Sequence, residues 1–96
     1  MVDMSLVIER GRSFVRELLK NLADAGIRLG ENPKWNKYGC VEDVPAQELR
    51  ILSRLGEKSY EIPTSDLEGA SKGYFDSKAK MQQIITAIVR DQCTKT

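Results

Sequence analysis

The stretch that decides the predicted fold class is residues 5–25, which read SLVIERGRSFVRELLKNLADA. At about 100° per residue its apolar side chains fall on one side, which is the period of an amphipathic helix. That side consists of Val7, Gly11, Phe14, Val15, Leu18, Leu19 and Leu22. Gly26 follows where a helix often takes a left-handed residue. We therefore predict a helix from about Ser5 to Ala25.

Gly11 lies within the apolar side of this helix. Glycine in a helix interior costs about 1 kcal/mol relative to alanine, so its presence calls for a compensating gain. The close approach of a second helix at this position is the compensation that we expect.

A second helix is predicted from Pro45 to Gly56. Proline suits the first turn of a helix, because its missing N–H has no intrahelical partner there. The buried side of this helix would consist of Leu49, Ile51, Leu52 and Leu55. After it, Ser59–Ile62 alternates polar and apolar residues, as a short strand does.

Two more helices are predicted in the last third of the chain. Ser65 and Glu68 have the spacing of a capping box, in which each side chain accepts a hydrogen bond from the other residue's backbone N–H. The helix they open should be short, because Gly69 and Gly73 weaken it. The final helix is expected from about Ser77 to Gln92. Its narrow apolar side consists of Met81, Ile84, Ile85, Ile88 and Val89.

These segments together predict an all-α fold with a single domain over residues 1–96. Three main helices and one short helix would enclose one core, with room for one small extended segment. The narrow apolar side of the final helix could form a homo-oligomer, although packing against the first helix is the alternative that we favour.

The composition excludes a strong overall attraction to nucleic acid or membranes. The chain has 15 basic and 14 acidic residues, for a formal charge of +1, so such contacts must come from a local patch. No apolar run approaches the roughly 20 residues of a membrane-spanning helix. Cys40 and Cys93 are far apart and no signal-peptide pattern is present, so we expect two thiols in a cytoplasmic protein. A disulfide between them is the alternative.

The residues that most enzymes need for catalysis are missing from this sequence. It has no histidine, which is the commonest general base and metal ligand. No glycine-rich phosphate-binding motif is present either, and two cysteines cannot supply the four ligands of a structural zinc site. We therefore expect a protein that is not an enzyme and that uses no cofactor or metal.

The best candidate for a binding site is the stretch Lys34–Gly39. It contains Trp35 and Tyr38 together with Lys34 and Lys37. Rigid aromatic side chains flanked by cations are typical of contact surfaces, because they give a large contact area at little entropic cost. The sequence leaves open whether Trp35 faces a partner or turns inward to fill the core.

A nucleic-acid face is the alternative site. Arg12, Arg16 and Lys20 follow one another at four-residue spacing along one edge of the first predicted helix. Arg50 and Arg54 repeat that spacing on the second predicted helix. With the loop lysines these side chains could contact phosphates, whereas an ordinary solvated helix surface is the simpler interpretation.

One short pattern resembles a known family. The run Trp35–Gly39 followed by Val44–Arg50 is similar to a pattern in small phage head–tail connector and tail-completion proteins, which carry Trp-Asn-acid-aromatic-Gly and then Ile-Pro-Ala-Arg-Pro-Phe. This chain differs from it at Lys37, Gln47 and Glu48. It is also expected to lack the strands that surround the motif in that family. The resemblance implies a role in virion assembly.

These observations predict a non-enzymatic protein that binds another macromolecule, most often a protein. A virion-assembly part, or an inhibitor or regulator from a phage or mobile element, would fit this description. The alternative is a small nucleic-acid-binding regulator that uses the basic helix faces.

Overall fold

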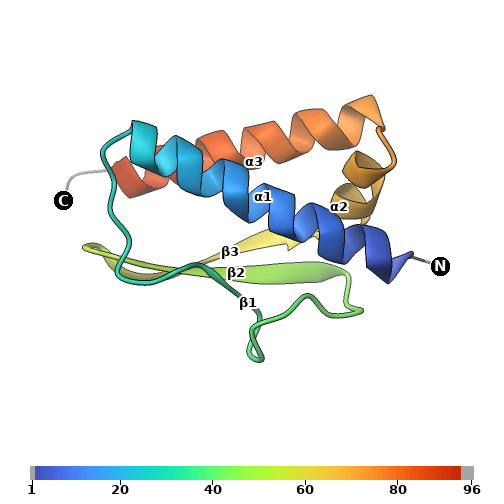
Figure 1. Cartoon of the computed structure of the whole chain (residues 1–96), viewed down its shortest axis with the longest axis horizontal. Coiled ribbons are helices and arrows are strands. Elements are labelled where there is room, and N and C mark those ends of the chain that lie inside the picture. The colour runs from blue at the N-terminus through green and yellow to red at the C-terminus, as the bar shows by residue number, and fades with distance from the viewer. Residues whose placement is uncertain (1, 94–96) are drawn as a thin grey trace.

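The computed structural model describes residues 2–93, in which three helices cover one face of a three-stranded antiparallel sheet (Figure 1). The elements along the chain are α1 (Met4–Asp24), β1 (Lys34–Trp35), β2 (Ala46–Ser53), β3 (Gly56–Pro63), α2 (Thr64–Ser71) and α3 (Phe75–Cys93). The strands lie in the order β1-β2-β3. The prediction of an all-α fold is therefore wrong, because the chain combines helices with a sheet.

The error lies in the segment that was predicted to be the second helix. Residues 46–53 form strand β2, in which Gln47, Leu49 and Ile51 are buried and alternate with the exposed Glu48 and Leu52. The four apolar residues of this segment, Leu49, Ile51, Leu52 and Leu55, are too few to distinguish the helical period from the strand period. The partner strand decides between them, since every residue of β2 pairs with one of β3, from Ala46↔Pro63 to Ser53↔Gly56.

The short strand predicted at Ser59–Ile62 is confirmed, and it is longer than expected. Strand β3 runs from Gly56 to Pro63 and is joined to β2 by the two residues 54 and 55. Gly56, which was expected to end a helix, has a φ of 91° and closes this tight hairpin instead.

The first predicted helix is confirmed as α1. Asp3 caps its N-terminus by accepting a hydrogen bond from the Ser5 backbone N–H (3.0 Å). The close neighbour of Gly11 is not a second helix, however. A Cβ at Gly11 would lie 3.3 Å from Val41 Cγ1 and 3.6 Å from Trp35 Cζ2, so the glycine lets α1 approach the segment between β1 and β2.

Helices α2 and α3 exist as predicted, but they begin differently. Pro63 precedes α2, and within the described residues no side chain caps that helix. The expected capping box with Ser65 is not formed, because the Glu68 carboxylate accepts from the backbone N–H of Asp3 at the start of α1. Helix α3 starts at Phe75, two residues before the predicted Ser77.

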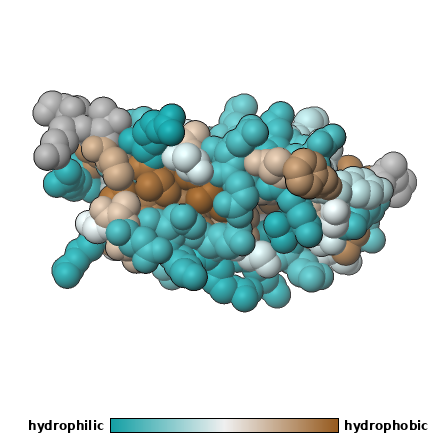
Figure 2. Space-filling view, turned by 90° about the horizontal axis from the view of Figure 1, so that it is seen from above, coloured by the Kyte–Doolittle hydropathy of each residue, from teal (hydrophilic) through white to brown (hydrophobic). Residues whose placement is uncertain are grey.

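The core lies between the helices and the inner face of the sheet. Its fully buried large side chains include Phe14, Leu18, Leu49, Ile51, Ile62, Met81, Ile85 and Ile88. Helix α3 therefore uses its apolar side within the chain, beside α1 and α2, as the favoured alternative predicted. Seen from the helix side, the surface is mostly hydrophilic, and hydrophobic side chains show in a strip where α1 and α3 run side by side (Figure 2).

Candidate functional site

Residues 36–45, which we call the aromatic loop, connect β1 to β2 at the lower edge of the molecule in Figure 1. They follow directly on Trp35 and contain Tyr38, Lys37 and Cys40. The motif that resembles the phage connector proteins thus begins on one strand, runs through this loop and ends on the next strand. The expectation that strands are missing around it is wrong.

The structure separates the two aromatic residues that were predicted to act together. Trp35 is 9% exposed, and its ring lies 6.1 Å from that of Phe14 on α1, at an angle of 50°. It therefore takes the inward of the two orientations left open, and anchors the loop to α1. Tyr38 is 74% exposed, and the ammonium of Lys37 lies 5.7 Å from the centre of its ring.

The first half of the aromatic loop is held by Asn36. This residue has a positive φ of 52°, which asparagine tolerates better than most residues. Its Nδ2 donates to the Cys40 carbonyl oxygen (2.9 Å) and to Gln47 Oε1 (2.7 Å). Its Oδ1 accepts from the backbone N–H of Glu48 (2.9 Å). The side chain thereby closes the turn that presents Tyr38.

The second half of the loop is held by Gln47, whose side chain is completely buried. Its Oε1 accepts from the Glu42 N–H (2.9 Å), and its Nε2 donates to the Glu42 carbonyl (2.7 Å) and to Thr64 Oγ1 (2.7 Å). The Thr64 hydroxyl in turn donates to the Val44 carbonyl. We call Asn36, Gln47 and Thr64 the amide clamp, which fixes the loop at both ends.

The amide clamp was not predicted from the sequence. The available signal was a glutamine two residues before Leu49 and four before Ile51, which places it on the buried side of a strand. A buried amide needs partners for all its polar atoms, and loop backbone groups are the nearest ones. With residues 45–56 predicted as a helix, Gln47 could not be assigned to the buried face of a strand.

A hollow of about 470 Å³ lies between α1 and the aromatic loop. It is lined by Ile8, Arg12, Trp35, Gly39, Cys40 and Val41. Ile8 is 41% exposed, although it is a large apolar residue, and the guanidinium-bearing Arg12 is exposed as well. We call this feature the α1–loop hollow; its chemistry is an apolar surface with a cation at its margin.

Lys34 does not belong to this site. Side chains of neighbouring residues in a strand point to opposite faces, so Lys34 lies on the outer face of the sheet while Trp35 faces α1. Its ammonium lies 3.6 Å from Glu31 Oε1. Of the four predicted contact residues, only Lys37 and Tyr38 are exposed on the aromatic loop.

The predicted nucleic-acid face is divided between different surfaces. Arg12, Arg16 and Lys20 are exposed on α1, which covers the inner side of the sheet. Arg50 and Arg54 lie on strand β2 and on the hairpin turn, so the helix on which they were placed does not exist. Only the three cations of α1 remain together.

Arg50 serves the structure of the loop and the outer sheet face. Its Nη2 donates to the Asn36 carbonyl oxygen (2.9 Å), and it pairs with Glu48 and Glu57, each at 3.7 Å. These contacts engage its charge within the chain, which leaves little for a phosphate.

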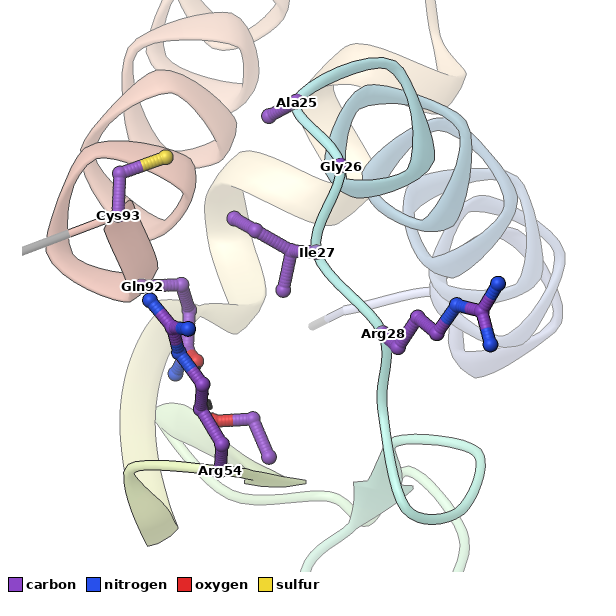
Figure 3. A pocket seen from close by; sticks show the side chains of 8 residues that line it. Ala25, Gly26, Ile27, Arg28, Arg54, Gln92 and Cys93 are labelled. Carbon is purple, nitrogen blue, oxygen red and sulfur yellow. Dashed lines mark hydrogen bonds between the residues drawn. The ribbon is translucent and has the colours of Figure 1, made fainter.

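A second cavity, of about 500 Å³, lies at the opposite end of α1 (Figure 3). Ile27 and the thiol of Cys93 point into it, whereas Arg28 points away. The side chain of Gln92 in its wall is 2% exposed and satisfied, by Ser53 Oγ (2.6 Å) and Tyr60 Oη (2.9 Å).

Next to that cavity, a charged network joins β3 to α3. The Tyr60 hydroxyl donates to the Asp91 carboxylate, which also accepts from Lys58 Nζ (2.9 Å). Burial, and then the bond to Asp91, raises the pKa of Tyr60 to about 12. The hydrogen bond from Tyr60, followed by that from Lys58, lowers the pKa of Asp91. We call these three residues the carboxylate network; it keeps the phenol protonated and ties α3 to the hairpin.

Other features add no further site. Within residues 2–93 no three histidine, cysteine or acidic side chains are grouped as metal ligands, and Cys40 and Cys93 are exposed, unpaired thiols. None of the helices described has the length and apolar character to cross a bilayer. Comparison with protein families, with curated proteins and with solved structures gives no match for this chain.

Proposed function

We propose that this chain is a non-enzymatic binding protein that recognises another protein through the aromatic loop and the α1–loop hollow. The observation that carries the proposal is the exposure of Tyr38, at 74%, on a loop that buried side chains hold at both ends. A contact loop that is already ordered loses little conformational entropy on binding, which favours affinity.

The hollow beside the loop supports the same role. Interfaces draw most of their binding energy from a few large side chains that enter apolar pockets and are shielded from water by polar neighbours. Ile8, Trp35 and Val41 supply an apolar surface of this kind, and Arg12 supplies a cation at its margin. The site thus combines a protruding aromatic residue with a recess for a partner's side chain.

The motif and the thiols support a biological setting for this role. An inhibitor or regulator from a phage or mobile element, or a part of a virion, would present this loop to its target. Two exposed cysteines that remain thiols suit a cytoplasmic protein, where disulfides are rare.

Nucleic-acid binding is the second candidate, and the observation in its favour is the exposed row of Arg12, Arg16 and Lys20 on α1. Three cations on a chain with a net charge of +1 support weak, strongly salt-dependent contacts at most. A titration of the protein with DNA and RNA at low salt tests it directly, and measurable binding that Tyr38→Ala leaves intact would favour this candidate.

The test of the proposed function compares two exposed tyrosines. Tyr38→Ala, Tyr74→Ala and the unchanged protein are immobilised and used to capture proteins from the native host, with nuclease-treated lysate as a further arm. Tyr74 is the matched control, because it is 58% exposed at the turn between α2 and α3. We expect a protein that the unchanged chain and Tyr74→Ala retain equally and that Tyr38→Ala retains at least about tenfold less. Equal capture by all three variants would contradict the proposal.

A further inference from the structure

The start of α3 exposes an aromatic side chain that the fold does not use. Phe75 is 82% exposed, and Asp76, directly after it, is exposed too. A phenylalanine side chain left in water loses about 1.5–3 kcal/mol of stabilisation relative to a buried one. The exposed Phe75 ring therefore contributes little to the stability of the fold. Phe75 and Asp76 together form a protruding apolar group with a carboxylate beside it.

The α1–loop hollow has the complementary chemistry. Arg12 lines this hollow, and Lys37 is an exposed residue of the aromatic loop. Within the described residues neither cation has a carboxylate within ion-pair distance. Other cations do have one, as Lys58 has Asp91 at 2.9 Å. The hollow therefore suits an apolar side chain that brings a negative charge with it.

We propose that the hollow accepts Phe75 of a second copy of this chain, with Asp76 of that copy paired to Arg12. The contact rests on the site of the proposed function and names an occupant for it. Opposite charges thereby meet at the centre of the proposed contact, which favours both the rate and the specificity of association.

The two halves of this contact lie on different parts of one molecule. Phe75 is the first residue of α3, and the turn between α2 and α3 lies at the upper right of Figure 1. The residues that line the hollow belong to the N-terminal half of α1 and to the segment 35–41. The contact therefore forms between copies. Two copies that each place Phe75 in the hollow of the other form a closed dimer. If each copy instead places Phe75 in the hollow of the next, an open chain of copies forms.

A second copy fits better than a nucleic acid for two reasons. The hollow is apolar, and the Tyr38 ring on which a base would stack already has the Lys37 ammonium near its face. A second copy also requires no further component, because both halves of the contact are present on the chain.

Sedimentation velocity from the low micromolar to the millimolar range tests the inference with the full chain. We expect concentration-dependent association that Phe75→Ala weakens at least about tenfold. Leu52→Ala is the matched control, since Leu52 is a partly exposed apolar residue on the outer face of the sheet, and it should leave association unchanged. A strictly monomeric chain, or equal association of both variants, overturns the proposal.

Exchanging the two charges tests the pairing itself. Arg12→Glu and Asp76→Lys are each expected to weaken association by about three- to tenfold, and the double variant should recover most of the loss. Additive weakening in the double variant would exclude the Arg12–Asp76 pair. The proposed function is judged separately, by capture at concentrations where the chain is monomeric. If Tyr38→Ala abolishes capture while Phe75→Ala does not change sedimentation, the self-contact fails and the proposed function stands.

Discussion

The molecule contains two polar networks that differ in composition and in what they hold. The amide clamp (Asn36, Gln47 and Thr64) is buried and carries no formal charge, and it fixes the aromatic loop to β2 and α2. The carboxylate network of Lys58, Tyr60 and Asp91 is partly exposed and charged, and it ties β3 to α3. A buried neutral network can shape a loop at every pH at which the chain folds, whereas a charged one depends on protonation.

The largest effect is expected from removing the centre of the amide clamp. Gln47→Leu keeps the size of the side chain but leaves the Glu42 backbone N–H and carbonyl without their Gln47 partner. The Thr64 hydroxyl loses the donor from Gln47 and keeps its bond to the Val44 carbonyl. Buried groups that lose a hydrogen bond cost about 1–3 kcal/mol each, so unfolding in urea should show a loss of about 3 kcal/mol. The exposed Gln82→Leu on α3 is the control, with a change below about 0.5 kcal/mol. Equal values for the two variants would mean that the clamp contributes nothing.

A somewhat smaller effect is expected at Asn36, where hydrogen bonds and backbone conformation can be separated. Asn36→Ala removes the side-chain bonds and places alanine at a φ of 52°, so we expect a loss of about 2 kcal/mol. Asn36→Gly removes the same bonds without the steric cost of a Cβ, and should be about 1 kcal/mol less destabilising. If glycine were the worse of the two, the positive φ would not persist in solution.

The carboxylate network should reveal itself through pH. Because the folded state lowers the pKa of Asp91, its contribution is complete above the ordinary value of 3.8 and is lost as the pH falls through the lower folded value. Urea unfolding at a series of acidic pH values should therefore show a loss of stability that Asp91→Asn reduces. Gln47→Leu should follow the unchanged protein in parallel at a lower stability. A clamp variant with a different acid slope would contradict the distinction between the two networks.

The smallest effect on stability is expected at the tip of the loop. Tyr38 and Lys37 are exposed, and a cation–π contact of this kind is worth about 0.5–1 kcal/mol at most. Tyr38→Ala should therefore change the free energy of unfolding by less than about 1 kcal/mol. A larger loss would show that Tyr38 supports the fold, and would remove the reason for assigning it to a partner.

Some elements of this fold could be predicted from the sequence, and others could not. Helix α1 could be predicted because its seven apolar-side positions, from Val7 to Leu22, repeat over about four and a half helical turns, which no strand reproduces. The segment from Pro45 to Gly56 could not, because Leu49, Ile51, Leu52 and Leu55 are compatible with both periods. Its strand conformation depends on pairing with residues 56–63, a long-range interaction that local patterns do not contain.

The stretch Lys34–Gly39 stays a candidate site, and the orientation of its side chains could not be predicted from the sequence. The stretch Lys34–Gly39 does contain the exposed aromatic residue of the loop, yet the sequence could not show that Trp35 turns inward or that Lys34 lies on the other face. Both follow from the two-residue strand β1, which sends neighbouring side chains to opposite sides. The amide clamp depends on the same sheet, and so it was hidden by the same error.

Backbone dynamics test the central claim, that the aromatic loop is held in one shape before it binds. Amide ¹⁵N relaxation of the free chain gives an order parameter for each residue, and rigid backbone has values of about 0.85. We expect residues 37–42 to reach about the values of α1 and to lose them in Gln47→Leu. Order parameters below about 0.6 in the unchanged protein would contradict the account, because a flexible loop offers no ordered surface for recognition.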